Sequence, residues 1–245
     1  MISENLKEIQ NKIQETVGKI KGRTVDDVLL LAVSKTQPEE RMKEAIDSGI
    51  YYFGENKVQE LTKKYALFSE EVPEAEAEAE ADESQKNKIH WHFIGHLQTN
   101  KVKQVVGKVD LIHSVDSFKL ASEIERQSKQ KEITTPILIE VNMARELSKF
   151  GVLPENVEPL VREISLMKHI EVKGLMTVAP MVENPEDNRI YFQAMRQLLM
   201  ALNEKQIEGI AMSELSMGMS NDYLVAIEEG ATIVRVGTGV FGVRT

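Results

Sequence analysis

Short apolar runs alternate with longer amphipathic segments along almost the whole chain of 245 residues, and this alternation constrains the fold more than any other feature. The clearest run covers residues 28–33, six apolar residues that lead into Ser34 and Lys35. A run this short, rich in valine and leucine, is typical of a strand buried on both faces of a parallel sheet. We expect strands at residues 28–33, 52–54, 90–95, 111–115, 136–142, 172–177, 213–217 and 232–237.

Helical patterns separate the expected strands and also precede the first one. Apolar residues recur three or four positions apart from Leu6 to Ile20, which predicts an amphipathic helix over residues 3–21. Asn184 followed by Pro185 predicts the start of another helix, because asparagine caps helices and proline suits the first helical position. This second helix is expected to turn five apolar side chains inward: Ile190, Met195, Leu198, Leu199 and Leu202.

The number and order of the elements indicate the fold. Strands that alternate with helices form parallel βα units, and eight such units close into a barrel of about 250 residues. We therefore predict the α/β class, with residues 1–245 forming a single (β/α)8 TIM barrel domain and an extra N-terminal helix. A doubly wound open sheet is the alternative that the pattern leaves open.

An acidic segment interrupts the regular pattern between the second and third expected strands. Residues 70–83 hold eight acidic residues and no basic one, whereas the whole chain has a formal net charge of -9. The remainder of the chain is therefore nearly neutral, and it has no basic stripe that would indicate nucleic acid as a partner. We expect residues 70–88 to form a solvated, mobile insertion, because like charges repel and no apolar face is present.

The sequence also restricts the compartment and the kinds of site. Cysteine is absent, which excludes disulfides and cysteine metal sites. The N-terminus lacks the apolar core of a signal peptide, and no segment approaches about 18 unbroken apolar residues. We predict a cytoplasmic protein without a membrane partner.

Lys35 stands at the carboxyl end of the first expected strand, where α/β barrels place their active sites. A lysine at this place has two interpretations. It is either a solvated strand end or a partly desolvated amine, whose lowered pKa suits it to form a Schiff base with a carbonyl compound. The residues at the other strand ends distinguish between these two interpretations.

Two loops near the carboxyl terminus have the character of a phosphate site. Residues 216–222 follow the seventh strand and lead into a helix expected near Ser220, and residues 237–242 follow the eighth strand. Their glycines let backbone amides approach an anion, and barrels often bind phosphate at these two loops. The alternative is a pair of ordinary turns with a serine cap.

One arginine and two histidines occupy unusual places within expected strands. Arg235 has the parity of Ile233, so it faces either the barrel interior, where it needs a partner or ligand, or the outer helices. His90 and His92 share one strand face, as a metal pair would. They lie at the start of their strand without a third ligand nearby, so we expect no metal site.

Six motifs together resemble the pyridoxal phosphate homeostasis protein family, over residues 28–244 apart from the acidic insertion. The family is similar to the barrel half of alanine racemase, a fold-type III barrel for pyridoxal 5'-phosphate (PLP). The motifs are Ala-Val-Ser-Lys35, Phe53-Gly-Glu-Asn56, His90-Trp-His-Phe-Ile-Gly-His-Leu-Gln-Thr-Asn-Lys101, Gly174-Leu-Met-Thr177, Leu215-Ser-Met-Gly-Met-Ser220 and Val234-Arg-Val-Gly-Thr238.

The resemblance implies how PLP would be bound. Lys35 forms the internal aldimine, and Arg235 faces the pyridine nitrogen. An arginine there stays cationic and weakens the ring as an electron sink, which suits binding better than carbanion chemistry. The full set of implied cofactor-binding residues is Lys35, Asn56, Met176, Ser220, Arg235, Gly237 and Thr238, with Ser220, Gly237 and Thr238 at the phosphate.

The resemblance favours a PLP-binding protein, acting as a monomer, that holds PLP and delivers it to recipients such as PLP-dependent apoenzymes. The alternative is an amino-acid racemase of the alanine racemase type. A racemase requires a base on each face of its substrate, and only Lys35 is well placed. The sequence also ends at Thr245, where alanine racemase continues into a second domain. We therefore assign no catalytic residue, and a barrel for another phosphorylated ligand is a third possibility.

Overall fold

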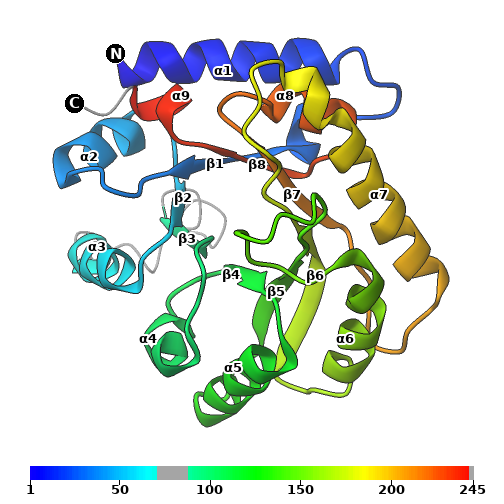
Figure 1. The fold of residues 1–245 in the computed structure, drawn as a ribbon. Helices are drawn as coiled ribbons and strands as arrows, with labels where there is room; N and C mark the ends of the chain where they lie inside the picture. The colour runs from blue at the N-terminus through cyan, green and yellow to red at the C-terminus, as the bar shows by residue number, and fades with distance from the viewer. Residues whose placement is uncertain (71–87, 243–245) are drawn as a thin grey trace.

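The computed structural model describes residues 1–70 and 88–242, and these residues form a closed barrel of eight parallel strands (Figure 1). The predicted TIM barrel is therefore confirmed, and the open sheet is excluded. The acidic segment, residues 70–88, falls almost entirely outside the described residues. The strands are β1 (Leu29–Val33), β2 (Tyr52–Glu55), β3 (His90–Phe93), β4 (Leu111–Val115), β5 (Thr135–Glu140), β6 (Ile170–Met176), β7 (Glu214–Met219) and β8 (Ile233–Val236).

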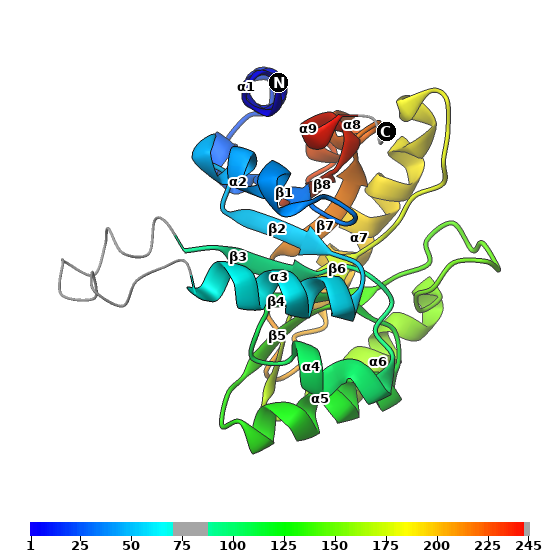
Figure 2. The same ribbon diagram turned by 90° about the vertical axis from the view of Figure 1, so that its left-hand side faces the viewer.

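Helices surround the barrel and bury its outer face (Figure 2). The N-terminal helix lies across one side of the barrel, against α2, α8 and α9. The α-helices are α1 (Ile2–Val17), α2 (Glu39–Asp47), α3 (Val58–Glu70), α4 (Val102–Val105), α5 (Phe118–Gln130), α6 (Val157–Ile164), α7 (Arg189–Glu204), α8 (Tyr223–Glu228) and α9 (Thr238–Phe241), with 3-10 turns η1 (Val25–Asp27), η3 (Thr99–Lys101), η4 (Pro154–Asn156) and η5 (Pro185–Asn188).

Helices α1 and α7 depart in detail from the sequence-based prediction. Helix α1 ends at Val17, four residues before the predicted end, and Ile20 lies in the following turn while still packing on the core. In α7, Met195 and Leu202 are buried, but Ile190 is 63% exposed, so its predicted inward position is wrong. The buried stripe of α7 runs instead through Phe192, which lies two residues and thus about 200° around the helix from Ile190.

The interior of the barrel is lined by alternate residues of the strands. Leu31, Leu111, Leu138, Met176 and Ile233 form a cluster separate from the core that lies between strands and helices. Because side chains alternate across a strand, residues with the same parity share this interior. Polar side chains point into the barrel interior at a few such positions, and some of these side chains belong to the candidate site.

Among the described residues, no helix is long and apolar enough to cross a membrane. The cytoplasmic location stays a prediction.

Candidate functional site

The loop after β1 holds Lys35 between two anchored neighbours. Ser34 is buried, and the Thr36 backbone N–H donates to Glu60 Oε2 at 2.7 Å. Thr36 has a φ of 62°, in the left-handed region that a threonine rarely adopts. Lys35 itself is half-buried. The chain therefore fixes the backbone on both sides of the lysine at the carboxyl end of β1.

A buried ion pair beneath this loop provides the second anchor. Glu55, the last residue of β2, is fully buried, and its Oε1 accepts from Ser34 Oγ at 2.6 Å and from Lys64 Nζ at 2.7 Å. Lys64 Nζ also donates to the Ser34 carbonyl at 2.7 Å. Burial raises the pKa of Glu55, while Lys64 opposes that shift. Sequence reasoning missed this pair, because Lys64 lies on a helix surface pattern and only the fold brings it to Glu55.

The two loops predicted to bind phosphate meet directly. Ser220 Oγ accepts from the backbone N–H groups of Gly237 at 3.2 Å and Gly239 at 3.3 Å. A Cβ on Gly239 would lie 2.7 Å from Val236 Cγ1, so a larger residue at this position would crowd the end of β8. Thr238, between the two glycines, is exposed. A hydroxyl and backbone amides converging at an open edge are the groups that hold a phosphate.

The predicted helix start near Ser220 is wrong. Helix α8 begins at Tyr223 with Asp222 as its N-cap. The Asp222 carboxylate accepts from the Met219 backbone N–H at 2.7 Å and from Asn188 Nδ2 at 2.7 Å, which holds the turn before the helix. The phosphate site predicted at this edge therefore rests on Ser220 and the 237–239 amides rather than on a helix beginning at Ser220.

Arg235 points into the barrel, so the alternative of an outward salt bridge is wrong. The side chain is 4% exposed, and its guanidinium donates to Ser216 Oγ at 2.6 Å and to the Thr177 carbonyl at 2.8 Å. Within the described part of the chain, it has no carboxylate ion pair within 4.0 Å. Burial lowers the pKa of Arg235 to about 10, and Glu140 and Asp222 oppose that shift. The group therefore remains cationic at neutral pH.

Asn56 and Met176, two of the implied cofactor-binding residues, lie at strand ends with different surroundings. Met176 is 1% exposed at the end of β6, inside the barrel. Asn56 follows β2, next to the strand that carries Lys35, and its Oδ1 is buried with no hydrogen-bond partner among the described residues. Gly95 makes room for Asn56, because a Cβ there would lie 2.1 Å from the Asn56 carbonyl oxygen. An orphaned acceptor at this edge fits a polar ligand.

Glu140 is a site residue that the sequence analysis did not single out. It ends β5 with the parity of Leu138, which places it inside the barrel, and it is 7% exposed. Burial, with Asp116 adding to it and Arg235 opposing it, raises the pKa of Glu140 to about 7. Its Oε2 has no partner among the described residues. Strand parity was the signal that could have found it.

The two histidines that share a face of β3 make different contacts. His90 stacks on Tyr52, with ring centroids 4.5 Å apart, and His92 Nδ1 lies 2.9 Å from His113 Nε2 in the interior. Among the residues that the structure describes, no cluster of three or more His, Asp or Glu is placed to hold a metal ion.

Comparisons with known proteins identify the family of the chain. A family model described as the N-terminal domain of alanine racemase matches residues 5–245. The pyridoxal phosphate homeostasis protein of Aquifex aeolicus is 44% identical over 241 residues, which cover 98% of this chain and 97% of the relative. The protein of the same name from Escherichia coli K12 is 32% identical over 244 residues, covering 99% and 97%.

Solved structures agree with these matches. PipY of Synechococcus elongatus, solved with PLP bound, is 30% identical with a TM-score of 0.80, covering 99% of this chain and 100% of that one. An unknown protein from Bifidobacterium adolescentis has a TM-score of 0.87 at 35% identity, covering 98% and 94%. Alanine racemase from Corynebacterium glutamicum, with a TM-score of 0.68, is 14% identical and covers 99% and 61%, a likeness that shows the fold alone.

The fold and the site thus define a class, the barrels that share the N-terminal domain of alanine racemase. Within this class, the chain belongs to the pyridoxal phosphate homeostasis protein family.

Proposed function

We propose that this protein binds PLP at the carboxyl end of the barrel and holds it for PLP homeostasis and delivery. The observation that carries the proposal is the combination of three groups at this end of one barrel. These groups are the Lys35 amine after β1, the contact of Ser220 with the Gly237 and Gly239 amides, and the buried Arg235 guanidinium. PLP supplies an aldehyde that condenses reversibly with a lysine amine.

Each group has a role that follows from its chemistry. Lys35 holds the aldehyde carbon, and the anchored neighbours Ser34 and Thr36 keep its backbone in place. Ser220, with the amides of the 237–239 turn and the exposed Thr238 hydroxyl, holds the phosphate. Asn56 Oδ1, buried without a partner among the described residues, accepts a hydrogen bond beside the ring, and Met176 packs there.

Arg235 explains why holding is favoured over catalysis. Because its guanidinium stays cationic, it discourages protonation of a neighbouring pyridine nitrogen. An unprotonated ring is a weak electron sink, so this arrangement suits reversible binding better than carbanion chemistry. The racemase alternative has only the distant fold likeness to support it.

Delivery requires that another protein reach the mouth of the barrel. Several apolar side chains around this mouth are exposed, among them Leu147 and Phe150 after β5, Met181 after β6 and Met219 at the end of β7. Exposed apolar groups gathered around a site are typical of protein contact surfaces. They support PLP-dependent apoenzymes as recipients. The monomeric state stays a prediction, which sedimentation measurements check.

The proposal is tested by loading the purified protein with PLP and reducing it with borohydride. We expect a visible absorption band, and after reduction a cofactor adduct on the peptide that contains Lys35. Lys35→Ala removes the band and the adduct. Lys173→Ala, which changes a lysine that lines a pocket at the opposite end of the barrel, keeps both.

A colourless protein that stays unlabelled after incubation with PLP overturns the cofactor assignment. Binding with steady amino-acid racemisation that Lys35→Ala abolishes favours the racemase alternative instead.

A further inference from the structure

A chain of buried polar side chains crosses the barrel interior from Arg235 to its opposite end. Arg235 Nη1 donates to Ser216 Oγ at 2.6 Å, and Ser216 Oγ lies 2.9 Å from His113 Nδ1. His113 Nε2 lies 2.9 Å from His92 Nδ1. The four residues come from β8, β7, β4 and β3, and none is more than 4% exposed.

The two histidines of this hydrogen-bond chain, His92 and His113, are neutral. Burial lowers the pKa of His92 to about 3, and His90 adds to that shift. Burial also lowers the pKa of His113 well below its ordinary value, with further contributions from His92 and Arg235. A neutral imidazole has one nitrogen that donates and one that accepts. Each ring can therefore pass a hydrogen bond along the chain in one direction only.

Arg235 sets that direction. A guanidinium only donates, so Ser216 Oγ accepts from it and keeps its own proton for another partner. Ser216 is fully buried, and among the described residues the only other hydrogen-bond neighbour of its Oγ is His113 Nδ1. Leaving a buried hydroxyl proton unpaired is energetically costly. Ser216 therefore donates to His113 Nδ1, His113 Nε2–H donates to His92 Nδ1, and His92 carries its proton on Nε2.

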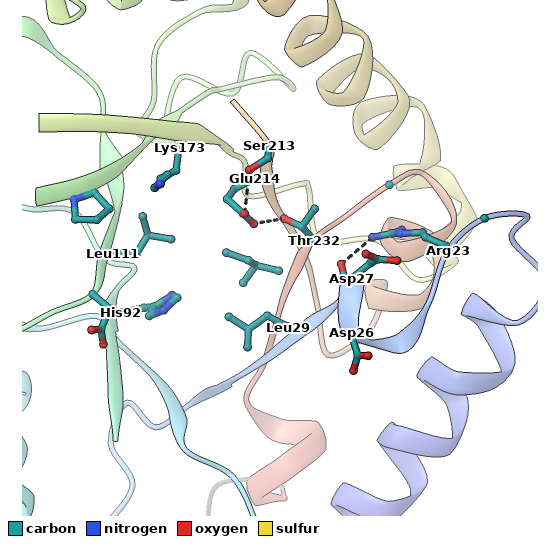
Figure 3. Close-up of a pocket in the computed structure, with 15 residues that line it drawn as sticks. Arg23, Asp26, Asp27, Leu29, His92, Leu111, Lys173, Ser213, Glu214 and Thr232 are labelled. Carbon is teal, nitrogen blue, oxygen red and sulfur yellow. Dashed lines mark hydrogen bonds between the residues drawn. The ribbon is translucent and has the colours of Figure 1, made fainter. Parts of the chain in front are cut away.

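The chain ends at a cavity of about 810 Å³ at the amino ends of the strands (Figure 3). Leu29, Leu111 and Glu214, the first residues of three strands, line it together with His92, whose ring points into the cavity. At the other end, Arg235 Nη2 donates to the Thr177 carbonyl, and the Thr177 hydroxyl donates to the Val141 carbonyl at 2.8 Å. The guanidinium is thus held from two directions.

We propose that Ser216 and His113 are positioning residues that fix the Arg235 guanidinium for its contact with the cofactor ring, within a polarised hydrogen-bond chain that ends at His92. This inference rests on the proposed function for the role of Arg235, but the chain itself is present without a ligand. Its polarity specifies the Nε2–H tautomer for both histidines. It also predicts that a substitution at Ser216 changes both the hydrogen bonding of His113 and the binding of the cofactor.

The first test is nitrogen NMR of the histidine rings in protein free of PLP. We expect His113 and His92 as neutral Nε2–H tautomers, with the proton-free Nδ1 of His113 shifted by its bond to Ser216. In Ser216→Ala that shift disappears. A Nδ1–H tautomer of His113 in the wild type overturns the proposed polarity whether or not the protein binds PLP, so this result separates the inference from the proposed function.

The second test uses the affinity and the absorption of bound PLP to report whether the Arg235 guanidinium is correctly placed. Ser216→Ala should raise the Kd for PLP about tenfold, the loss expected for one hydrogen bond to a charged group, and shift the absorption of bound PLP. His113→Gln, whose amide can accept from Ser216 and donate to His92, should keep the wild-type spectrum, whereas His113→Leu should not. Wild-type protein that fails to bind PLP contradicts the proposed function and leaves the tautomer test decisive.

Ser114→Ala provides the matched control. Ser114 is a buried serine next to His113 on β4, and its Oγ has no partner among the described residues. Its removal should change neither the His113 tautomer nor the PLP spectrum. Equal effects of Ser114→Ala and Ser216→Ala, or no effect of Ser216→Ala on either readout, contradict the positioning role.

Discussion

Glu140 is a buried acid whose charge depends on the fold. Its pKa of about 7 lies above the ordinary 4.5, so the folded protein retains a proton that the unfolded chain releases. The free energy of unfolding therefore falls as pH rises from about 4.5 to 7, and the full loss remains above pH 7. The shift corresponds to about 3 kcal/mol.

Glu140→Gln removes this penalty. We expect the variant to be more stable than wild type at pH 8 by up to about 3 kcal/mol, with the difference shrinking toward pH 5, as measured by urea unfolding at both values. The exposed Glu163 supplies the control, because Glu163→Gln makes the same chemical change at the surface and should not reproduce the gain in stability at pH 8. Parallel pH profiles of Glu140→Gln and wild type would contradict the raised pKa of Glu140.

Sequence reasoning at the residue scale succeeded where a periodic pattern applied. The parity of Arg235 with Ile233 raised the possibility that it faces the interior, and the structure places it there. Glu140 has an equally informative parity with Leu138, but the surrounding apolar residues of the strand mask it. The pair of Glu55 and Lys64 was not predictable in this way, because it depends on how α3 packs on β2.

At the scale of elements, that pair joins α3 to the ends of β1 and β2. Removing one partner of a buried ion pair leaves the other charge uncompensated, at a cost of about 3–5 kcal/mol. We expect Lys64→Met to lower the free energy of unfolding by this amount and to weaken PLP binding. The Ser34 carbonyl loses the hydrogen bond from Lys64, and Glu55, which accepts from Ser34 Oγ, loses its buried cation. Denaturant unfolding and a PLP titration measure the two effects.

The double variant Glu55→Gln with Lys64→Met separates charge from packing. Because it leaves no buried charge, it should recover most of the lost stability. Lys63→Met, on the exposed neighbouring lysine, should change stability by less than about 1 kcal/mol. A double variant as unstable as Lys64→Met would show that packing of the Lys64 stem, rather than the ion pair, holds the loop.

The strands were predicted more closely than the helix ends. Buried parallel strands are nearly continuous apolar runs, and β4 was predicted over the range that the structure shows. Helix ends depend on local caps that compete with the apolar pattern. Helix α1 ends at Val17 with Gly18 as its C-cap, before Ile20, and α8 begins at Tyr223 after its N-cap Asp222. The positions of these helix ends depend on backbone hydrogen bonds that sequence spacing does not specify.

At the scale of the whole molecule, a ligand held by several strands should stabilise the entire barrel. Its proposed contacts come from the ends of β1, β2, β6, β7 and β8, which unfolding separates. A ligand that binds only the folded state at 100 times its Kd adds about 2.7 kcal/mol. For a chain of 245 residues, this corresponds to a rise in Tm of about 5–10 °C.

Calorimetric scans with PLP, with inorganic phosphate and with pyridoxal separate the contribution of the phosphate group to this rise in Tm from that of the rest of the ligand. We expect PLP to raise Tm most, phosphate alone to raise it less, and Ser220→Ala to reduce both effects, because the Gly237 and Gly239 amides lose the hydroxyl that joins the two loops. Lys35→Ala should reduce the PLP effect and keep the phosphate effect. If Lys35→Ala abolished the phosphate effect as well, the amine and the phosphate cradle would not be separate parts of one site.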